Sequence, residues 1–437
     1  MAKPIVAIIG RQNTGKSTLL NRMAGKPLAI VQDQPGTTRD RIFANVEWRS
    51  TEFTVVDTGG LEPETESVIT RGINAQIEAA INAADVIIFL VDVAEGVTAT
   101  DLEISNILRK AGKPVLVAAN KADNVRLESE AVEFYELGLG EPMPIAAHHG
   151  RNTAELMDEI IPLLPEQEPQ ESVTEAVRIA IVGRPNVGKS MLLNTLVGDK
   201  RVIVDDTPGT TRDAIDTLFD FKGQSVLLID TAGVRRRGSI KAGIEKYSVI
   251  RTLRAIDRAD IALLLLDATE PATSQDLHIG GYIQQAAKGI IIIVNKWDLI
   301  KEKSTSEWNE YIKYLFKFFT YAPVLFISAK TGQGVGKIMP QVVKVHRERQ
   351  KRLTTATVNS IIQQAVASHQ PARVRGKQPK IFYSTQAETN PPTFVFFVND
   401  AKLIHFTYRR YLENKLRETF GFYGTPIRLV FKTRGES

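Results

Sequence analysis

Residues 10–17 read GRQNTGKS, the G-x-x-x-x-G-K-S pattern of a loop that binds phosphate. An apolar run at 4–9 precedes the loop and TLLNRMAG at 18–25 follows it, so a strand, the loop and a helix are predicted in that order. In this setting the glycines let backbone N–H groups surround a triphosphate at the positive end of the helix. Lys16 then reaches the β- and γ-phosphates, and the Ser17 hydroxyl is predicted to bind Mg²⁺.

The phosphate-binding pattern occurs twice in the chain. Residues 183–190 read GRPNVGKS, again between an apolar run and a helix-forming segment. At the same offset of 173 residues, DQPGTTRD at 33–40 matches DTPGTTRD at 206–213, and DTGG at 57–60 matches DTAG at 230–233. After insertions, NKAD at 120–123 matches NKWD at 295–298, and AA at 146–147 matches SA at 328–329. A repeat of this length predicts two tandem copies of one nucleotide-binding domain.

Short runs rich in β-branched residues alternate with helical stretches in both copies. We expect strands at 86–91, 114–119, 261–266 and 289–294, and helices at 100–111 and 275–287. Apolar strands that alternate with helices predict an α/β fold, in which a mostly parallel sheet carries helices on both faces. Ligand-binding groups should then lie at the carboxyl ends of the strands.

The last fifth of the chain has another pattern and another charge. A helix from about 358, strands at 380–385 and 393–398, a helix at 408–420 and a strand at 426–431 predict a three-stranded sheet packed against helices. Residues 341–437 carry 17 Lys and Arg against 6 Asp and Glu, net +11, whereas the first 340 residues carry 38 against 44, net −6. This charge fits either contact with nucleic acid or a solvated face. The Phe and Tyr residues here are expected in the core rather than as base-stacking platforms, because alternate strand positions must be buried.

Composition limits the class of protein further. The 437 residues are 43% apolar and 24% charged, which is typical of a soluble protein with several domains. No apolar run reaches the roughly 18–20 residues of a membrane-spanning helix, and the N-terminus enters a strand without a signal sequence. The lack of cysteine excludes disulfides, thiolate metal sites and cysteine-linked lipid anchors. We therefore expect a cytoplasmic protein that binds no membrane.

The Asp-x-x-Gly and Thr-Thr motifs predict contacts to Mg²⁺ and to the γ-phosphate. Asp57 and Asp230 follow apolar runs and are predicted to hold Mg²⁺ through water, while the N–H groups of Gly60 and Gly233 sense the γ-phosphate. One threonine of each pair is predicted to complete the Mg²⁺ shell, and we expect it to be the second of the pair, Thr38 or Thr211. The predicted Mg²⁺ ligands are Ser17, Thr38, Asp57, Ser190, Thr211 and Asp230.

The two Asn-Lys-x-Asp boxes predict the base. The carboxylate of Asp123 or Asp298 accepts from N1–H and the 2-amino group of guanine, whereas adenine would leave the acid unpaired. The alternative is that the aspartate only caps a helix, and the occurrence of the box twice in register argues against this interpretation. GTP and GDP are therefore the expected ligands. Further predicted contacts are Gly10, Asn13, Thr14, Gly15, Lys16, Thr18, Asn120, Lys121 and Ala147, and in the second copy Gly183, Asn186, Val187, Gly188, Lys189, Met191, Asn295, Lys296, Ser328, Ala329 and Lys330.

Hydrolysis needs a group that stabilises charge in the transition state. Where Ras-like enzymes carry a water-orienting glutamine, this chain has Leu61 and Val234. Asn13 and Asn186 lie three residues before the phosphate-loop lysines, a position at which asparagine ligates K⁺ in GTPases that use a monovalent ion. The alternative is an asparagine that only caps the turn. The predicted catalytic set is Lys16, Asn13, Thr38, Gly60, Lys189, Asn186, Thr211 and Gly233.

These motifs resemble the Der (EngA) family of bacterial GTPases over nearly the whole chain. The resemblance includes both phosphate loops, both PGTTRD segments, both Asn-Lys-x-Asp boxes, and a tail with NDAKLIHFTYRRYLENKLRE at 399–418 and GTPIRL at 424–429. It implies a C-terminal KH-like domain, K⁺-stimulated GTP hydrolysis, and a role in maturing the large (50S) ribosomal subunit with rRNA as partner. We expect a first GTPase domain at 1–164, an acidic linker at 165–176, a second GTPase domain at 177–347 and the KH-like domain at 348–437, in a chain that is monomeric in solution.

The chain departs from the family pattern at Gln12, Thr14, Ala146 and Met191. Met191 would forfeit a hydroxyl contact to the α-phosphate, and Ala146 a polar contact near the base. The GFYG sequence at 421–424 has the spelling of the RNA-binding loop of KH domains, but it lies between a predicted helix and a strand, so we do not read it as that loop. The expected function is a GTPase that couples nucleotide state to rRNA binding. The alternatives are a non-hydrolysing, nucleotide-sensing RNA scaffold and a P-loop ATPase.

Overall fold

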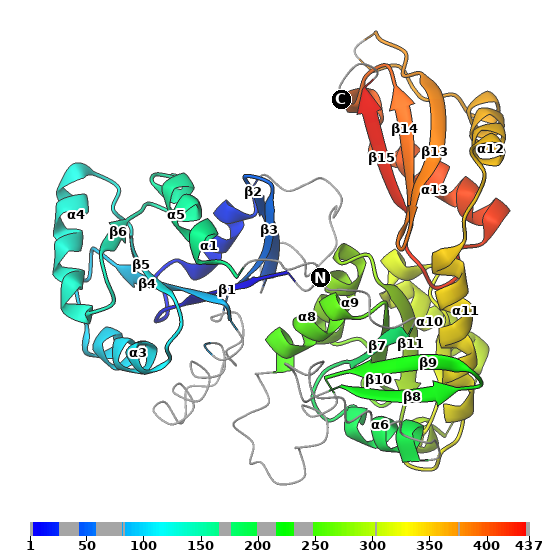
Figure 1. Cartoon of the computed structure of the whole chain (residues 1–437), viewed down its shortest axis with the longest axis horizontal. Coiled ribbons are helices and arrows are strands. Elements are labelled where there is room, and N and C mark those ends of the chain that lie inside the picture. Colours follow the sequence, from blue (N-terminus) through cyan, green and yellow to red (C-terminus); the bar gives the residue numbers. More distant parts are fainter. Residues whose placement is uncertain are drawn as a thin grey trace. The chain divides into compact units, whose positions relative to one another are not determined.

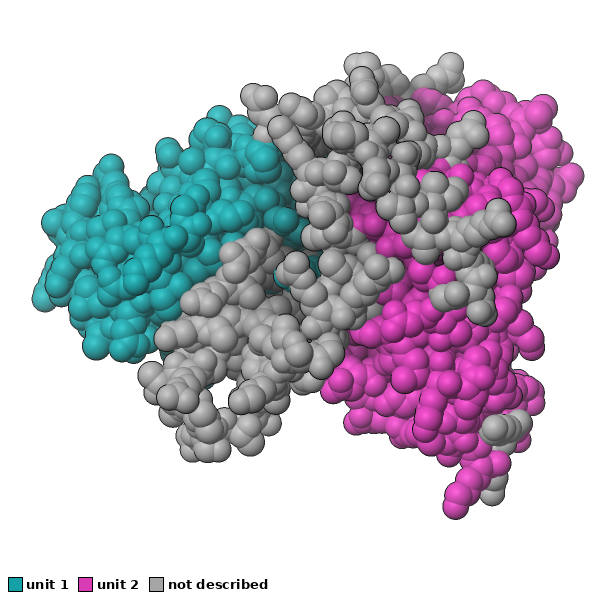
Figure 2. Space-filling view, turned by 60° about the horizontal axis from the view of Figure 1, so that its bottom comes forward, with its two compact units in different colours: residues 1–171, 240–254 teal, residues 172–239, 255–437 magenta. Residues whose placement is uncertain are grey.

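The computed structural model describes residues 3–25, 43–57, 81, 84–165, 176–198, 216–230, 248–301, 304–374 and 376–433. The chain divides into two compact units, one of residues 1–171 with 240–254 and one of residues 172–239 with 255–437 (Figure 2). Within the described ranges, no helix has both the length and the apolar character that crossing a membrane requires.

The first unit contains a six-stranded sheet with the strand order β2-β3-β1-β4-β5-β6 (Figure 1). Strands β2 and β3 are antiparallel, and the other neighbouring pairs are parallel. Every residue of β1 and β4 is buried, as a sheet covered on both faces requires. The elements are β1 (Ile5–Ile9), α1 (Lys16–Met23), β2 (Phe43–Trp48), β3 (Thr51–Asp57), β4 (Val86–Asp92), α3 (Ala99–Lys110), β5 (Val115–Asn120), α4 (Val125–Glu130), η2 (Ala131–Leu137), β6 (Pro142–Pro144), α5 (Thr153–Ile160) and η3 (Ile161–Leu163).

The second unit repeats this sheet, with the order β8-β9-β7-β10-β11-β12 and one antiparallel pair, β8 with β9. The prediction of two mostly parallel α/β domains is therefore confirmed. The elements are β7 (Val177–Val182), α6 (Lys189–Gly198), β8 (Thr217–Phe221), β9 (Gln224–Ile229), α8 (Ser248–Arg258), β10 (Ile261–Asp267), α9 (Ser274–Gln285), β11 (Gly289–Asn295), η6 (Trp297–Leu299), α10 (Thr305–Leu315), η7 (Lys317–Phe319), β12 (Val324–Phe326), η8 (Val335–Lys337) and α11 (Ile338–Gln350).

The C-terminal part folds as the predicted α-β-β-α-β domain (Figure 1). Its sheet has the order β13-β14-β15, antiparallel between β13 and β14 and parallel between β14 and β15. Apolar side chains of both helices pack with Phe394 and Phe396, which are fully buried. The expectation that aromatic residues lie in the core does not hold for Phe382 and Tyr383, which are 44% and 43% exposed. The elements are α12 (Thr355–Ser368), β13 (Ile381–Thr389), β14 (Pro392–Val398), η9 (Ala401–Leu403), α13 (Phe406–Phe420) and β15 (Arg428–Thr433).

The GFYG segment at 421–424 attaches the C-terminal domain to the second sheet. The Gly424 carbonyl accepts a hydrogen bond of 2.8 Å from the Ile290 N–H of β11, and the Gly424 N–H donates one of 2.9 Å to the Tyr321 carbonyl. Gly424 has φ +68°, and a Cβ there would lie 2.3 Å from a methyl group of Val345. Only glycine fits this close approach. The segment is therefore engaged in a contact within the chain.

Arg349, in the last turn of α11, strengthens the same contact. It is 2% exposed, and it donates through Nε to Asn390 at 2.8 Å and through Nη1 to the Ala287 carbonyl and the Thr425 hydroxyl at 3.1 and 3.2 Å. Burial lowers the pKa of the guanidinium to about 10. A buried charge needs such partners, because it would otherwise cost several kcal/mol. Helix α11 is continuous from Ile338 to Gln350 and so spans the predicted boundary after residue 347.

Candidate nucleotide-binding sites

Each phosphate loop closes tightly against the asparagine of the Asn-Lys-x-Asp box in its own domain. Gly15 has φ +95° and Gly188 has φ +100°, and both precede a helix. A Cβ on Gly15 would lie 2.4 Å from Nδ2 of Asn120, and one on Gly188 would lie 2.3 Å from Nδ2 of Asn295. Glycine is therefore required at these positions by both backbone conformation and space.

The phosphate-loop lysines are held inside their loops. The Lys16 ammonium donates to the carbonyls of Gly10 and Arg11 at 2.8 and 2.7 Å, and the Lys189 ammonium donates to those of Gly183 and Arg184 at 2.6 Å each. Both lysines are 7% exposed. A positive charge is thus fixed in the concave side of each loop, where a polyphosphate is predicted to bind.

A single buried amide joins the phosphate loop to the predicted base loop in each domain. The Asn120 side chain donates to the Thr14 carbonyl at 2.7 Å and accepts from the Ala147 N–H at 3.0 Å. The Asn295 side chain makes the same pair of bonds, to the Val187 carbonyl at 2.7 Å and from the Ala329 N–H at 2.8 Å. The loop predicted to bind the phosphates and the loop predicted to bind the base are therefore held at a fixed separation.

Two predicted Mg²⁺ ligands meet in the first domain. The exposed Ser17 hydroxyl donates a hydrogen bond of 2.5 Å to Asp57, which is fully buried at the end of β3. A hydroxyl beside a carboxylate is a donor set that suits Mg²⁺. In the second domain, Asp230 follows β9 with φ +57°, and its N–H donates to Asp216. Four other predicted residues, Thr38, Gly60, Thr211 and Gly233, lie outside the described residues.

The lysine of each Asn-Lys-x-Asp box pairs with an aspartate that the sequence analysis did not single out. Lys121 lies 2.5 Å from Asp92, and Lys296 lies 2.5 Å from Asp267. Burial opposes ionisation of Asp267, but the hydrogen bonds from Lys296 and Thr269 outweigh it and lower its pKa. Both aspartates end a buried apolar strand, in repeat register with one another. That register was the signal by which the sequence could have identified them.

A second missed pair of contacts fixes the outer side of each phosphate loop. Arg11 pairs with Glu95 and with Asp101 at 3.2 Å, and Asp101 caps helix α3 together with Thr98. In the second domain, Arg184 pairs in the same way with Glu270 at 2.5 Å and with Asp276 at 3.6 Å, and Asp276 caps α9 together with Thr273. Desolvation by burial raises the pKa of Asp276. These contacts position the loops without reaching the predicted ligand-binding side.

The remaining predicted residues range from exposed to fully buried, with Ser328 at the buried extreme. Asp123 is 49% exposed and lies 3.8 Å from His149, and Asp298 is half-buried. The Ser328 hydroxyl accepts from the Thr331 N–H at 3.2 Å, a bond that Ala146 cannot make in the first domain. The other exposed members are Thr18, Lys330 and Met191, the last at 48%.

Asn13 and Asn186 occupy equivalent exposed positions in their phosphate loops. Asn13 has φ +63° and Asn186 has φ +62°. Asparagine tolerates this left-handed conformation better than most residues, which fits an asparagine that forms the turn. Both residues are exposed, and their K⁺ role stays a prediction.

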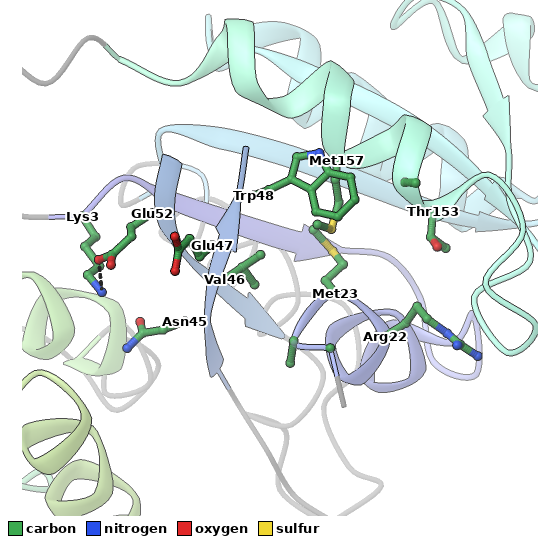
Figure 3. A pocket seen from close by; sticks show the side chains of 13 residues that line it. Lys3, Arg22, Met23, Asn45, Val46, Glu47, Trp48, Glu52, Thr153 and Met157 are labelled. Carbon is green, nitrogen blue, oxygen red and sulfur yellow. Dashed lines mark ion pairs between the residues drawn. The ribbon is translucent and has the colours of Figure 1, made fainter. Parts of the chain in front are cut away.

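A separate pocket of about 530 Å³ lies at the far end of α1 from the phosphate loop (Figure 3). Its lining includes the apolar side chains of Met23, Val46 and Met157, with Trp48 beside them and the Lys3–Glu52 ion pair at one side. Helix α1 is eight residues long, about 12 Å, which separates this pocket from Lys16. The predicted nucleotide chemistry does not involve it.

Two phosphate loops on parallel sheets, each joined by a buried asparagine to its own Asn-Lys-x-Asp loop, define a tandem P-loop GTPase. Residues 5–121 and 178–296 match the family "50S ribosome-binding GTPase", and residues 352–432 match "KH-domain-like of EngA bacterial GTPase enzymes, C-terminal". The chain is 50% identical to a GTPase Der of Caldanaerobacter subterraneus and to one of Desulfitobacterium hafniense, in each case over 439 residues that cover 100% of this chain and 100% and 99% of the relative. A GTPase Der of Clostridium novyi is 49% identical, with both chains covered completely.

The chain therefore belongs to the GTPase Der family, and its enzyme activity is the hydrolysis of GTP. This excludes the alternatives of a non-hydrolysing scaffold and of an ATPase. Among solved structures, Era in complex with MgGDPNP and part of 16S ribosomal RNA is 21% identical with a TM-score of 0.31, over 59% of this chain and 92% of that one.

Proposed function

We propose that this GTPase uses its two GTP-hydrolysing sites to control rRNA binding during assembly of the large (50S) ribosomal subunit. The observation that carries the proposal is the net charge of +11 in residues 341–437, beside a net −6 in the rest of the chain. Such a charge attracts RNA phosphates. The description of the matching family as ribosome-binding supports the same partner.

A short path through β11 supports coupling between the second nucleotide site and the C-terminal domain. Ile290, near the start of β11, donates to the Gly424 carbonyl of the C-terminal domain. Asn295, at the end of the same strand, holds the Val187 carbonyl of the phosphate loop. Five residues of strand span about 17 Å. Strand β11 thus contacts both the second phosphate loop and the C-terminal domain, so a rearrangement of the loop can be transmitted to the basic domain through this strand.

The metal assignments belong to this proposal. Mg²⁺ would be held by Ser17, Thr38 and Asp57 in the first domain and by Ser190, Thr211 and Asp230 in the second, and would neutralise charge between the β- and γ-phosphates. The 2.5 Å contact between Ser17 and Asp57 supports this fit. We propose K⁺ sites at Asn13 and Asn186, where the ion would stabilise charge in the transition state.

Phosphate release measured with GTP, in K⁺ and in Na⁺ at equal ionic strength, tests the ion. We expect K⁺ to raise the turnover number more than it raises GTP affinity, because it would act in the transition state. Asn13→Ala and Asn186→Ala should each remove part of this difference. Equal rates in the two salts would refute the K⁺ role.

Binding of the full chain to purified 50S subunits and to their rRNA tests the partner. Dependence of the affinity on salt, with a steep fall as salt rises, is the expected result for phosphate contacts. Failure to bind either target with any nucleotide would refute the function.

We further propose the domain limits given above, a monomer and a location in the cytoplasm. Sedimentation of the purified chain checks the monomer.

A further inference from the structure

The C-terminal sheet presents an open face opposite its two helices. In β14, Phe394, Phe396 and Val398 point into the core with the helices, so the alternate residues point to the other face. That face carries exposed large apolar side chains: Tyr383 is 43% exposed and Val430 is 37% exposed. Phe382, in an irregular stretch of β13, is 44% exposed. Large apolar groups gathered on an open face mark a binding surface.

The strand register sets these side chains side by side. Tyr383 is opposite Phe397, and their ring centroids are 5.9 Å apart at an interplanar angle of 44°. Phe397 is opposite Lys432 on the other side, so one row across the sheet reads Tyr383, Phe397, Lys432. The next row contains Val395 and Val430. The two neighbouring rings, tilted relative to one another, thus form an apolar surface with an ammonium group beside it.

The charge around this face favours a polyanion. Arg428 and Lys432 are exposed, and neither forms an ion pair with any residue that the structure describes. The loop before β13, which contains exposed Arg373, Lys377 and Lys380, enters the strand at Ile381, two residues before Tyr383. Among the described residues, the acid on this face is Glu388, which lies at the opposite end of β13 beside Thr393 and in the same row as Arg428, whereas Lys432 lies in the row of the rings. The aromatic end of the face is therefore the basic end.

We propose that the open face of the β13-β14-β15 sheet binds single-stranded RNA, with unpaired bases stacked on Tyr383 and Phe397 and phosphates held by Lys432 and by Arg373, Lys377 and Lys380 of the preceding loop. This deepens the proposed function and rests on it. Exposed rings on a sheet stack on bases of any sequence, and they require that the bases are not already stacked in a duplex. Cations beside the rings match the phosphates that accompany stacked bases, whereas an apolar protein surface would not require them.

The test uses the full chain and a fluorescent 12-nucleotide single-stranded RNA, with a hairpin of the same length as the paired probe. Tyr383→Thr should weaken binding of the single strand by about 10-fold, because it removes one stacking platform. Tyr383→Thr should leave the salt slope unchanged, which is the slope of the logarithm of affinity against the logarithm of salt concentration. Tyr383→Phe keeps the ring and should bind like the unchanged chain. Lys432→Gln should instead lower the salt slope by about one, as the loss of one phosphate contact does.

Two outcomes would overturn this inference. If Tyr383→Thr and Phe397→Thr bind the single strand as the unchanged chain does, the rings do not stack on bases. If the variants lose 50S binding but not single-strand binding, the face takes a protein partner. In both cases the unchanged chain still binds 50S subunits or their rRNA, so the proposed function survives. GTP hydrolysis without RNA should be equal in all variants, which shows that they are folded.

Discussion

The Ser17 hydroxyl donates a hydrogen bond of 2.5 Å to the carboxylate of Asp57, although 40 residues separate them in the chain. The contact joins the first turn of α1 to the last residue of β3. Asp57 is fully buried and is the last residue of the strand, so the strand sets its position. The serine is thus placed where a cation beside the phosphate loop would meet both oxygen atoms.

Replacing Ser17 should weaken Mg²⁺-dependent binding of GTP at the first site. Ser17→Ala removes one of the predicted metal ligands, so we expect affinity to fall at least about 10-fold in Mg²⁺, or roughly 1.4 kcal/mol. In EDTA the variant and the unchanged chain should bind alike. Titration with a fluorescent GTP analogue measures both. The matched variant is Ser190→Ala in the second domain, and an equal loss with and without Mg²⁺ would argue against a metal ligand.

Asn295→Ala should destabilise the second GTPase domain. The change leaves the Val187 carbonyl and the Ala329 N–H without their buried partner, at a cost of about 2–4 kcal/mol. Asn120→Ala should have the same effect on the first domain alone. Calorimetric unfolding without nucleotide separates the two, since each variant should lower a different transition. Unchanged transitions would show that water or another group replaces the amide.

The base preference should follow the two predicted guanine-binding carboxylates. Asp123→Asn or Asp298→Asn reverses the hydrogen-bond polarity at that site, so affinity should shift from guanosine to xanthosine nucleotides. Titration with GTP and with xanthosine triphosphate measures the shift. The other domain of each variant is its internal control. Unchanged GTP affinity at the altered site would show that the carboxylate does not contact the base.

Lys288 should make the stability of the second unit depend on pH. Burial lowers the pKa of its ammonium to about 8, although the ammonium donates to the Asp257 carbonyl at 2.7 Å. Between pH 8 and about 10.5 the unfolded chain binds more protons, so this group's contribution to stability falls as pH falls through that range. Below pH 8 the loss is complete, at most about 3 kcal/mol.

Lys288→Met should therefore stabilise the unit relative to the unchanged chain at pH 8, and the difference should shrink toward pH 10.5. Chemical unfolding followed at several pH values measures it. Comparing the two chains at each pH cancels the other titrating groups. A difference that does not vary with pH would mean that the lysine is solvated and titrates normally.

The repeated motifs were sufficient to predict both mostly parallel sheets, because the phosphate loops, the Asp-x-x-Gly motifs and the Asn-Lys-x-Asp boxes each begin at or directly after the end of an apolar strand. The two PGTTRD segments lie outside the described residues. The partners of Lys121 and Lys296 were not predicted. The repeat places Asp92 and Asp267 at equivalent strand ends, but their pairing with the lysines follows from the sheet register, in which Asp92 lies opposite Asn120 and Asp267 opposite Asn295. The exposed Tyr383 was also missed. Alternation along a strand shows two faces but not which one is covered, and the irregular register between Ile381 and Tyr383 obscures even that.

Large-subunit rRNA binding in two nucleotide states tests the central claim most directly. The affinity of the full chain is measured with GDP and with a non-hydrolysable GTP analogue, before and after Arg373, Arg375 and Lys377 are changed to Ala. We predict that the two nucleotides give different affinities, more so at low salt, and that the charge changes weaken binding in both. An affinity that is indifferent to the nucleotide and to these charges would contradict the account.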